Sequence, residues 1–237
     1  MRFKRILLKL SGEAFHGSAE FGIDGPSVRK FAREIAAASK AGVQVAVVVG
    51  GGNFFRGAEL EALGMDRSAA DYIGMLATVM NALALQEALE AEGAVCRTQS
   101  AIEMHEVAEP YIKRRAVRHL EKGRVVTFAA GTGNPFFSTD TAGALRALEI
   151  GAEVFIKATR VDGIYDSDPE KNPKAKKIAR LTYTDALDRE LGILDATAFA
   201  LCRENNLPII VFNIFEENAL ARLLAGEEIG SFVSGGQ

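Results

Sequence analysis

The run Val45-Ala46-Val47-Val48-Val49 leads directly into Gly50-Gly51-Gly52-Asn53 and Phe54-Phe55-Arg56-Gly57, and this stretch decides the fold class. Five consecutive apolar residues, mostly β-branched, predict a strand that is buried on both faces. The three glycines remove every side chain at the point where the strand ends, so the backbone can come close to a ligand. Ligands bind at the carboxyl ends of the strands in an open α/β sheet, and Arg56 offers a planar guanidinium for phosphate oxygens. A tight strand-to-helix turn explains the glycines equally well, so this motif alone leaves both interpretations open.

Length, composition and charge narrow the class of protein. The chain has 237 residues, 48% of them hydrophobic, which is enough for one large α/β domain or two small ones. A net charge of −3 argues against a protein that coats nucleic acid. The basic cluster that begins at residues 113–115 is flanked by acidic residues, so it is typical of a solvated helix face. Cys96 and Cys202 belong to no motif and are expected to be reduced core residues.

Neither a leader nor a membrane span is expected from the sequence. A lysine interrupts the apolar residues soon after the basic start at residues 1–5, which is not the pattern of a signal peptide. The uncharged stretch at residues 72–86 is shorter than the roughly 20 residues that a membrane helix needs. These features predict a soluble cytoplasmic protein.

Strand and helix patterns alternate along the whole chain. This alternation predicts a three-layer α/β/α sandwich with a mainly parallel central sheet. An irregular segment at residues 158–177 is the only sign of a boundary, so we expect a single domain with lobes at about 1–157 and 158–237. The expected strands are 5–10, 45–49, 95–98, 124–130, 153–157, 207–213 and an edge strand at 230–233. The expected helices are 27–41, 67–91, 106–121 (interrupted near Pro110), 138–150, 184–191, 195–206 and 218–224.

Three apolar strands each end in a loop that contains glycine, at residues 11–12, 50–52 and 131–134. In a parallel sheet these loops share one edge, where their backbone N–H groups could hold two phosphate groups, as a kinase requires. The chain has no Gly-x-x-x-x-Gly-Lys-Ser/Thr sequence, so it is not a P-loop protein. A dinucleotide-binding fold is also disfavoured, because no Gly-x-Gly-x-x-Gly opens a helix after the first strand.

Charged residues near these loops are the candidates for chemistry. Lys9 lies in an apolar strand that ends in one of the loops, and it could neutralise a transferring phosphoryl group or extend to solvent. Asp140 begins the helix after the third loop. A carboxylate there stabilises the helix even if it has no other function, but Asp140 could also orient Lys9 or a Mg²⁺ ion. Asp71 begins the long apolar helix and could accept a hydrogen bond from a ribose hydroxyl.

The polar segment 159–169 is either a solvated loop or a nucleotide pocket. In the second interpretation Tyr165 would lie against a base, and Asp168 would lie near the ribose or a phosphate-bound metal. Phe136 and Phe137 could stack on a base, although such residues more often belong to a core. The three histidines lack metal-ligand spacing, and we assign no protein side chain to a metal.

Four motifs together resemble the bacterial uridylate (UMP) kinases, a family of the amino-acid-kinase superfamily. They lie in order at residues 9–13, 50–57, 131–140 and 158–163, and the resemblance covers essentially the whole chain. The block Gly-Thr-Gly-Asn-Pro-Phe-Phe at residues 131–137 is the most specific of the four. The resemblance implies the amino-acid-kinase or carbamate-kinase-like fold and transfer of the γ-phosphoryl group of ATP, with Mg²⁺, to UMP, giving UDP.

The same resemblance assigns roles to individual residues. Lys9, Arg56 and Asp140 would be catalytic, with Asp140 organising the lysine. ATP would be bound by Lys9, Leu10, Ser11, Gly12, Gly52, Arg56, Thr159, Tyr165 and Asp168. UMP would be bound by Gly51, Asp71, Thr132, Gly133, Asn134, Pro135, Phe136, Phe137, Ser138 and Thr139.

The resemblance also implies a homohexamer with GTP as activator and UTP as inhibitor. The segment that responds to GTP would be Gly17, Ser18, Ala19, Glu20, Phe21 and Gly22. The apolar helix at residues 72–85 independently suggests a subunit contact, because a helix that is apolar all round packs in a core or against another chain. The alternatives are a kinase of the same superfamily that acts on a carboxylate or carbamate, a non-catalytic nucleotide or oxyanion-binding protein, and a nucleic-acid-binding regulator that uses the cluster at residues 113–115.

Overall fold

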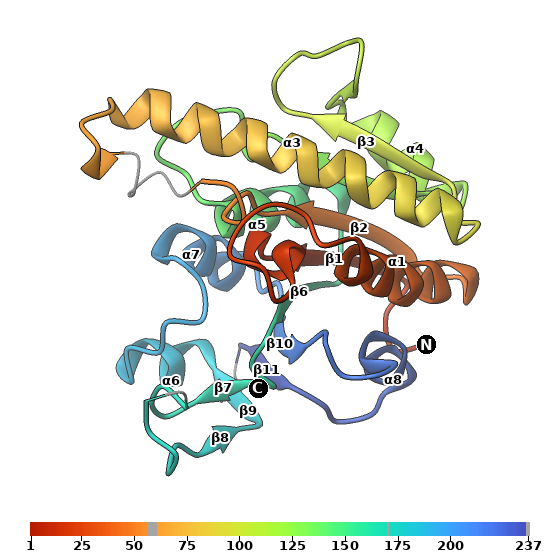
Figure 1. Ribbon diagram of the computed structural model, residues 1–237. Helices are drawn as coiled ribbons and strands as arrows, with labels where there is room; N and C mark the ends of the chain where they lie inside the picture. The colour runs from red at the N-terminus through yellow and green to blue at the C-terminus, as the bar shows by residue number, and fades with distance from the viewer. Residues whose placement is uncertain (56–60, 170, 236–237) are drawn as a thin grey trace.

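A nine-stranded sheet forms the centre of the molecule (Figure 1). The computed structural model describes residues 1–55, 61–169 and 171–235, and every statement about the fold concerns these residues. The strand order is β4-β3-β5-β2-β1-β6-β10-β11-β9, and only the β10–β11 pair is antiparallel. The strands are β1 (Arg5–Leu10), β2 (Gln44–Val49), β3 (Cys96–Ser100), β4 (Glu109–Pro110), β5 (Val125–Ala129), β6 (Val154–Thr159), β9 (Arg180–Thr182), β10 (Ile209–Asn213) and β11 (Ser231–Ser234). The predicted mainly parallel sheet is therefore confirmed.

Helices cover both faces of this sheet. One face carries the 3₁₀ helix η1 (Gly12–His16), α1 (Gly25–Lys40), α3 (Arg67–Ala91) and α8 (Ala219–Ala225). The other carries α4 (Lys113–Glu121), α5 (Thr139–Ile150), α6 (Tyr183–Asp188) and α7 (Ala196–Glu204). Alternate residues of the apolar strands enter the two cores, since Leu8 packs on the α1 side and Leu7 on the α5 side. This arrangement is the predicted three-layer sandwich.

The pleat of the central strands decides where the strand lysines point. Lys9 has the same parity as Leu7, so its side chain lies on the face that α5 covers. In the pairing of β1 with β6, Lys9 lies directly beside Lys157, and both residues are close to the carboxyl ends of their strands. The fold therefore brings two lysines together next to the start of α5.

Two predictions about elements are wrong. Residues 106–121 do not form one interrupted helix: Glu109–Pro110 pairs with β3, and α4 begins only at Lys113. Pro110 lacks an N–H group and restricts the residue before it to extended backbone, which favours an edge strand over a helix. The strand predicted at 230–233 is not an edge strand, because β11 lies between β10 and β9. The edge strand β9 was not predicted, because its three residues are too few to show a periodic pattern.

The segment 158–177, predicted to be irregular, contains a small antiparallel pair. Strands β7 (Ile164–Tyr165) and β8 (Lys177–Ile178) form a separate two-stranded sheet beside the main one. Its first strand follows Asp162-Gly163, the expected turn. A Cβ atom at Gly163 would lie 2.5 Å from Ser231 Oγ, so a larger residue would have to displace that side chain where this hairpin meets the main sheet.

The long helix α3 lies across one face of the sheet (Figure 1). By length and composition alone it could cross a membrane, and 44% of its most apolar window is buried inside the molecule. Its contacts with α1, β3 and β5 are those of a core helix. Tyr72, Leu76 and Met80, spaced four residues apart, form an exposed apolar stripe on its outer side.

Candidate functional site

The loops that follow β1, β2 and β5 meet at one edge of the sheet, as the sequence predicts for three neighbouring parallel strands. The N–H group of Gly50 donates to the carbonyl oxygen of Leu10 at 2.8 Å, which joins the first loop to the second. A Cβ atom placed on Gly12 would lie 2.3 Å from the backbone nitrogen of Gly52. A Cβ atom on Gly50 would likewise lie 2.6 Å from the backbone nitrogen of Gly12, so the two backbones approach this closely only because Gly12 and Gly50 lack side chains.

Substituting Gly12 with alanine should disrupt this contact. The added methyl group has only backbone atoms around it, so the loops must separate, and overpacking of this kind costs about 1–3 kcal/mol. We expect a lower melting temperature, measured by thermal unfolding. Gly25→Ala is the matched control, because its new methyl group would meet only the flexible guanidinium of Arg29. Equal behaviour of the two variants would contradict the close packing of the loops.

A carboxylate held between two lysines lies at this edge. Lys9 Nζ is 2.7 Å from Asp140 Oδ1, and Lys157 Nζ donates to Asp140 Oδ2 at 2.8 Å. Lys157 also donates to the carbonyl oxygen of Ile193 at 2.8 Å, which ties the cluster to the loop before α7. Lys9 and Asp140 are only 7% and 8% exposed, so these charges interact with little screening by solvent. The cluster carries a net positive charge, which suits a phosphate group beside it.

The ionisation of Asp140 depends on its neighbours. Burial on its own raises the pKa of this carboxyl, but the ammonium groups of Lys9 and Lys157 outweigh that effect and hold the pKa below its ordinary value of 3.8. The position in the first turn of α5 favours the anion as well, and Ser138 caps the helix by accepting from the N–H groups of Asp140 and Thr141. Asp140 is therefore an anion at neutral pH.

The sequence analysis missed Lys157. The signal was present, because Lys157 follows the apolar run Val154-Phe155-Ile156 much as Lys9 follows Ile6-Leu7-Leu8. Only the register of β1 against β6 reveals that the two lysines are neighbours. Lys9 and Lys157 are 148 residues apart, and a register across that distance cannot be deduced from either strand alone.

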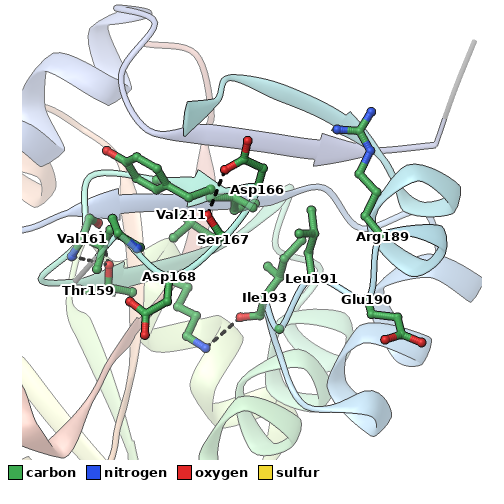
Figure 2. Close-up of a pocket in the computed structure, with 16 residues that line it drawn as sticks. Thr159, Val161, Asp166, Ser167, Asp168, Arg189, Glu190, Leu191, Ile193 and Val211 are labelled. Atoms are coloured by element: carbon green, nitrogen blue, oxygen red, sulfur yellow. Dashed lines mark hydrogen bonds between the residues drawn. The ribbon is translucent and has the colours of Figure 1, made fainter. Parts of the chain in front are cut away.

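A pocket of about 460 Å³ lies on one side of the lysine pair. Figure 2 shows Thr159 and Asp168 on one wall and Leu191 and Ile193 on the other. The apolar side chains give it the surface that a planar base needs, and the polar ones can bind a sugar. The three residues predicted from segment 159–169, Thr159, Tyr165 and Asp168, all line it, and so does Lys157. The Tyr165 hydroxyl donates to Asp162 Oδ1 at 2.6 Å, which fixes the ring at the pocket wall.

A second pocket, of about 140 Å³, lies on the other side, between α3 and the loop after β5. Asp71 of α3 reaches across it and accepts from the backbone N–H of Phe136 at 2.8 Å. Arg67, one turn earlier, holds the same carboxylate through its Nε. Predicted residues that line the pocket are Gly51, Gly52, Asp71, Thr132, Phe137, Ser138 and Thr139; residues that the sequence analysis missed include Gly74, Met75 and Thr78.

Other predicted residues lie outside the two pockets. Gly133, Asn134, Pro135 and Phe136 belong to the loop at the rim of the second pocket, and Phe136 is 68% exposed. The Leu10 side chain is fully buried, so only its backbone can face a ligand. Residues 17–22 form an exposed loop next to the glycine loop, and Arg56 lies outside the described residues.

Asp195 was also missed by the sequence analysis, and it joins the start of α5 to the start of α7. Its Oδ1 accepts from Thr141 Oγ1 at 2.8 Å, and its Oδ2 accepts from the hydroxyl of Ser138. It also caps α7 by accepting from the N–H groups of Thr197 and Ala198. One carboxylate therefore fixes the start of α5 relative to α7.

The described residues contain no group of three or more His, Cys, Asp or Glu side chains placed to hold a metal ion. Both oxygens of Asp140, the most buried carboxylate of the site, already face ammonium groups. Magnesium commonly binds through one or two carboxylates together with substrate phosphates, without an all-protein cage. A Mg²⁺ ion that binds in this way needs few protein ligands.

Comparisons with known proteins agree with this geometry. The model of the amino acid kinase family matches residues 4–213. The crystal structure of the UMP kinase from Bacillus anthracis is 37% identical, with a TM-score of 0.96 over 100% of this chain and 98% of that one. The UMP kinase from Ureaplasma parvum is 38% identical, with a TM-score of 0.92 over 99% and 100% of the two chains. The uridylate kinase from Archaeoglobus fulgidus is 29% identical, with a TM-score of 0.75 over 97% and 99%.

Proposed function

The chain belongs to the amino acid kinase family, and from this premise we propose that it transfers the γ-phosphoryl group of ATP to UMP, giving ADP and UDP. One observation carries the proposal: the Lys9–Asp140–Lys157 cluster lies between two pockets, one large enough for a nucleoside and one beside the glycine loop. The choice of UMP as acceptor follows from the full-length similarity to two proteins that are UMP kinases.

In the proposed reaction, a phosphate oxygen of UMP attacks the γ-phosphorus of ATP, and the bond from that phosphorus to the bridging oxygen of ADP breaks. The attacking oxygen is already an anion, so no general base is needed. The main obstacle is the repulsion between two anionic phosphates, which Lys9 and Lys157 offset while Asp140 holds both in place. Bound Mg²⁺ would add charge neutralisation on the ATP phosphates.

The remaining residues fall into two proposed binding sets. For ATP, Ser11, Gly12, Gly52 and Arg56 would meet the phosphates, with Leu10 contributing backbone only, and Thr159, Tyr165 and Asp168 would frame the nucleoside. For UMP, Gly51, Asp71 and residues 132–139 would surround the nucleotide, with Asp71 at the ribose. We also propose a single domain with an acceptor lobe at about 1–157 and an ATP lobe at about 158–237, joined by the continuous sheet. The residues that would meet the ATP phosphates lie in the first lobe, and those that would frame the nucleoside lie in the second.

An acceptor panel tests the proposal. The chain is incubated with ATP and Mg²⁺ and with UMP, CMP, dUMP, glutamate or carbamate in turn. ADP release is followed by a coupled assay, and the product is identified by chromatography. We expect UDP formation that requires UMP. Phosphorylation of glutamate or carbamate without phosphorylation of UMP would instead identify another small-acceptor kinase of the family.

We also propose that the enzyme is a homohexamer in which α3 contributes to a subunit contact. The support is the exposed stripe of Tyr72, Leu76 and Met80, whose side chains are each more than 40% exposed. Leu76→Glu should place a charge in that contact and shift the sedimentation profile toward smaller species. Glu87→Ala, an exposed change on the same helix, is the matched control. A wild-type chain that sediments only as a monomer at micromolar concentration would contradict this proposal.

GTP and UTP are the proposed activator and inhibitor, and residues 17–22 are the proposed segment that responds to GTP. Backbone contacts of that loop support a link to the site: Gly22 N donates to Asn53 O at 2.9 Å, and Arg160 donates to Gly17 O at 2.9 Å. Adding each nucleotide to the UMP assay tests this proposal.

We further propose that the protein is soluble and acts in the cytoplasm on free nucleotides.

A further inference from the structure

We propose that Thr78 and Asn81 of α3 are positioning residues, which fix the two backbone loops that form the acceptor pocket. Both side chains are almost completely buried, at 2% and 0% exposure, in a helix whose other inward-facing residues are mostly apolar. They lie three residues apart and therefore share a face with Gly74 and Asp71, which line the same pocket. The inference rests on the proposed function, because it assigns these residues a role in binding UMP.

Thr78 fixes the loop that follows β5. Its hydroxyl donates to the carbonyl oxygen of Met75 at 2.7 Å and accepts from the backbone N–H of Ala130 at 2.8 Å. Ala130 is fully buried and has a φ angle of +59°, a conformation that L-residues adopt only at a cost. It is the residue directly before Gly131-Thr132, where the loop enters the pocket. The hydroxyl of Thr78 thus stabilises the bend that aims this loop.

Asn81 fixes the glycine loop. Its amide nitrogen donates to the carbonyl oxygen of Gly50 at 2.7 Å and to Asn53 Oδ1 at 2.6 Å. The Asn53 amide nitrogen returns a bond to Asn81 Oδ1 at 2.9 Å and donates to the carbonyl oxygen of Gly22 at 2.7 Å. The two amides thus satisfy each other and bind backbone oxygens on both sides. Replacing either amide would leave buried polar groups without partners.

The glycine loop and α3 are so close that there is no room for a side chain at Gly51. A Cβ atom on Gly51 would lie 2.6 Å from the carbonyl oxygen of Gly74 and 3.2 Å from the backbone nitrogen of Thr78. The loop therefore rests on the helix backbone itself. Apolar residues at 78 and 81 could supply packing, but only hydrogen-bonding groups can set the orientation of the carbonyl and N–H groups in the two loops. This requirement explains why polar side chains occupy buried positions of this helix.

The test compares isosteric variants in steady-state assays with UMP and ATP. Thr78→Val removes the acceptor for the Ala130 N–H group, and we expect the KM for UMP to rise about tenfold while the KM for ATP stays within about twofold. Thr78→Ser keeps the hydroxyl and should recover most of the UMP affinity. Asn81→Asp removes the amide donors, and it should raise the KM of both substrates, because the glycine loop is proposed to meet both nucleotides.

Thr127→Val is the matched control. Thr127 is fully buried in β5, the strand that leads to the same loop. Within the described part of the chain, its hydroxyl has one hydrogen-bond partner, Cys96 Sγ at 3.4 Å. Thr127→Val removes a buried hydroxyl from β5 but leaves the hydrogen bonds of both loops in place. It should leave both KM values unchanged, even if it lowers the melting temperature as much as Thr78→Val does. Equal rises in the KM for UMP in both variants would show that Thr78 acts only through stability, and would overturn the proposal.

Hydrogen exchange of the unliganded chain separates this inference from the proposed function. Thr78→Val should speed amide exchange in peptides that cover residues 128–134, and Asn81→Asp should do so in peptides that cover residues 48–54. Peptides from β10 should exchange as in the wild type. Unchanged exchange at both loops would overturn the inference whatever the acceptor is. A wild-type chain that does not phosphorylate UMP would overturn the proposed function alone, and the exchange result would still decide whether the two side chains hold the loops.

Discussion

Lys9→Met should lower kcat for UDP formation by about 10²–10³-fold, the usual cost of removing one preorganised group that stabilises transition-state charge. The lysine ammonium lies next to Asp140, and both side chains are buried. In the variant, solvent therefore does not compensate for the lost positive charge. The KM for UMP should change much less than kcat, because the repulsion between the phosphates is greatest as they approach each other in the transition state.

The folded state should tolerate this substitution. Asp140 keeps Lys157 as a partner at 2.8 Å, so no unpaired charge is created, and methionine fills the volume of the lysine stem. Melting temperature and kcat are therefore measured together, with Lys122→Met, a change at an exposed lysine after α4, as the control. Lys9→Met with undiminished kcat would remove this lysine from the mechanism.

Asp140→Asn should damage both stability and catalysis. The variant leaves one buried ammonium group, that of Lys9, and one partly buried group, that of Lys157, facing an uncharged amide, and breaking a buried ion pair by removal of one partner costs about 3–5 kcal/mol. Lys9 and Lys157 would then repel each other and lose their common anchor, so kcat should fall by at least as much as in Lys9→Met. Denaturant unfolding and the UMP assay measure the two effects. A variant as stable as the wild type would contradict the described charge arrangement.

The stability difference between the wild type and Asp140→Asn should depend on pH in a defined direction. The carboxyl of Asp140 has a pKa below its ordinary value of 3.8 in the folded chain. Its ionised form therefore contributes stability that is fully present above the pKa of the unfolded chain and is lost as the pH falls through the folded pKa. We expect the difference in unfolding free energy to be constant between about pH 5 and 8 and to shrink below about pH 4.

The sequence predicted most of the fold because the central strands are unambiguous. The run at residues 45–49 has no polar residue, and the glycines that follow it at 50–52 mark the end of a strand buried on both faces. The errors arose where elements are short or lie at an edge. Glu109–Pro110 pairs over only two residues and β9 over three, which is too little sequence for any period to be detected.

The site was predicted less completely, for a different reason. Motifs identified the glycine loops, Lys9 and Asp140, because each is local in sequence. Lys157 and Asp195 matter through residues far along the chain, because Lys157 lies beside Lys9 and Asp195 accepts from Thr141, 54 residues away. Thr78 looks like an ordinary residue of an apolar helix until the structure places the N–H group of Ala130 beside it. Strand register and helix packing decide these contacts, and neither leaves a local pattern.

In the proposed mechanism, the two lysines stand between a nucleotide donor and a nucleotide acceptor. A crystal structure of the chain with UMP and a non-hydrolysable ATP analogue tests it most directly. We predict that Lys9 Nζ and Lys157 Nζ will lie within hydrogen-bond distance of phosphate oxygens, with the analogue's base in the pocket of Thr159 and Ile193 and the UMP ribose at Asp71. Phosphate groups bound at the opposite end of the sheet, away from both lysines, would contradict the account.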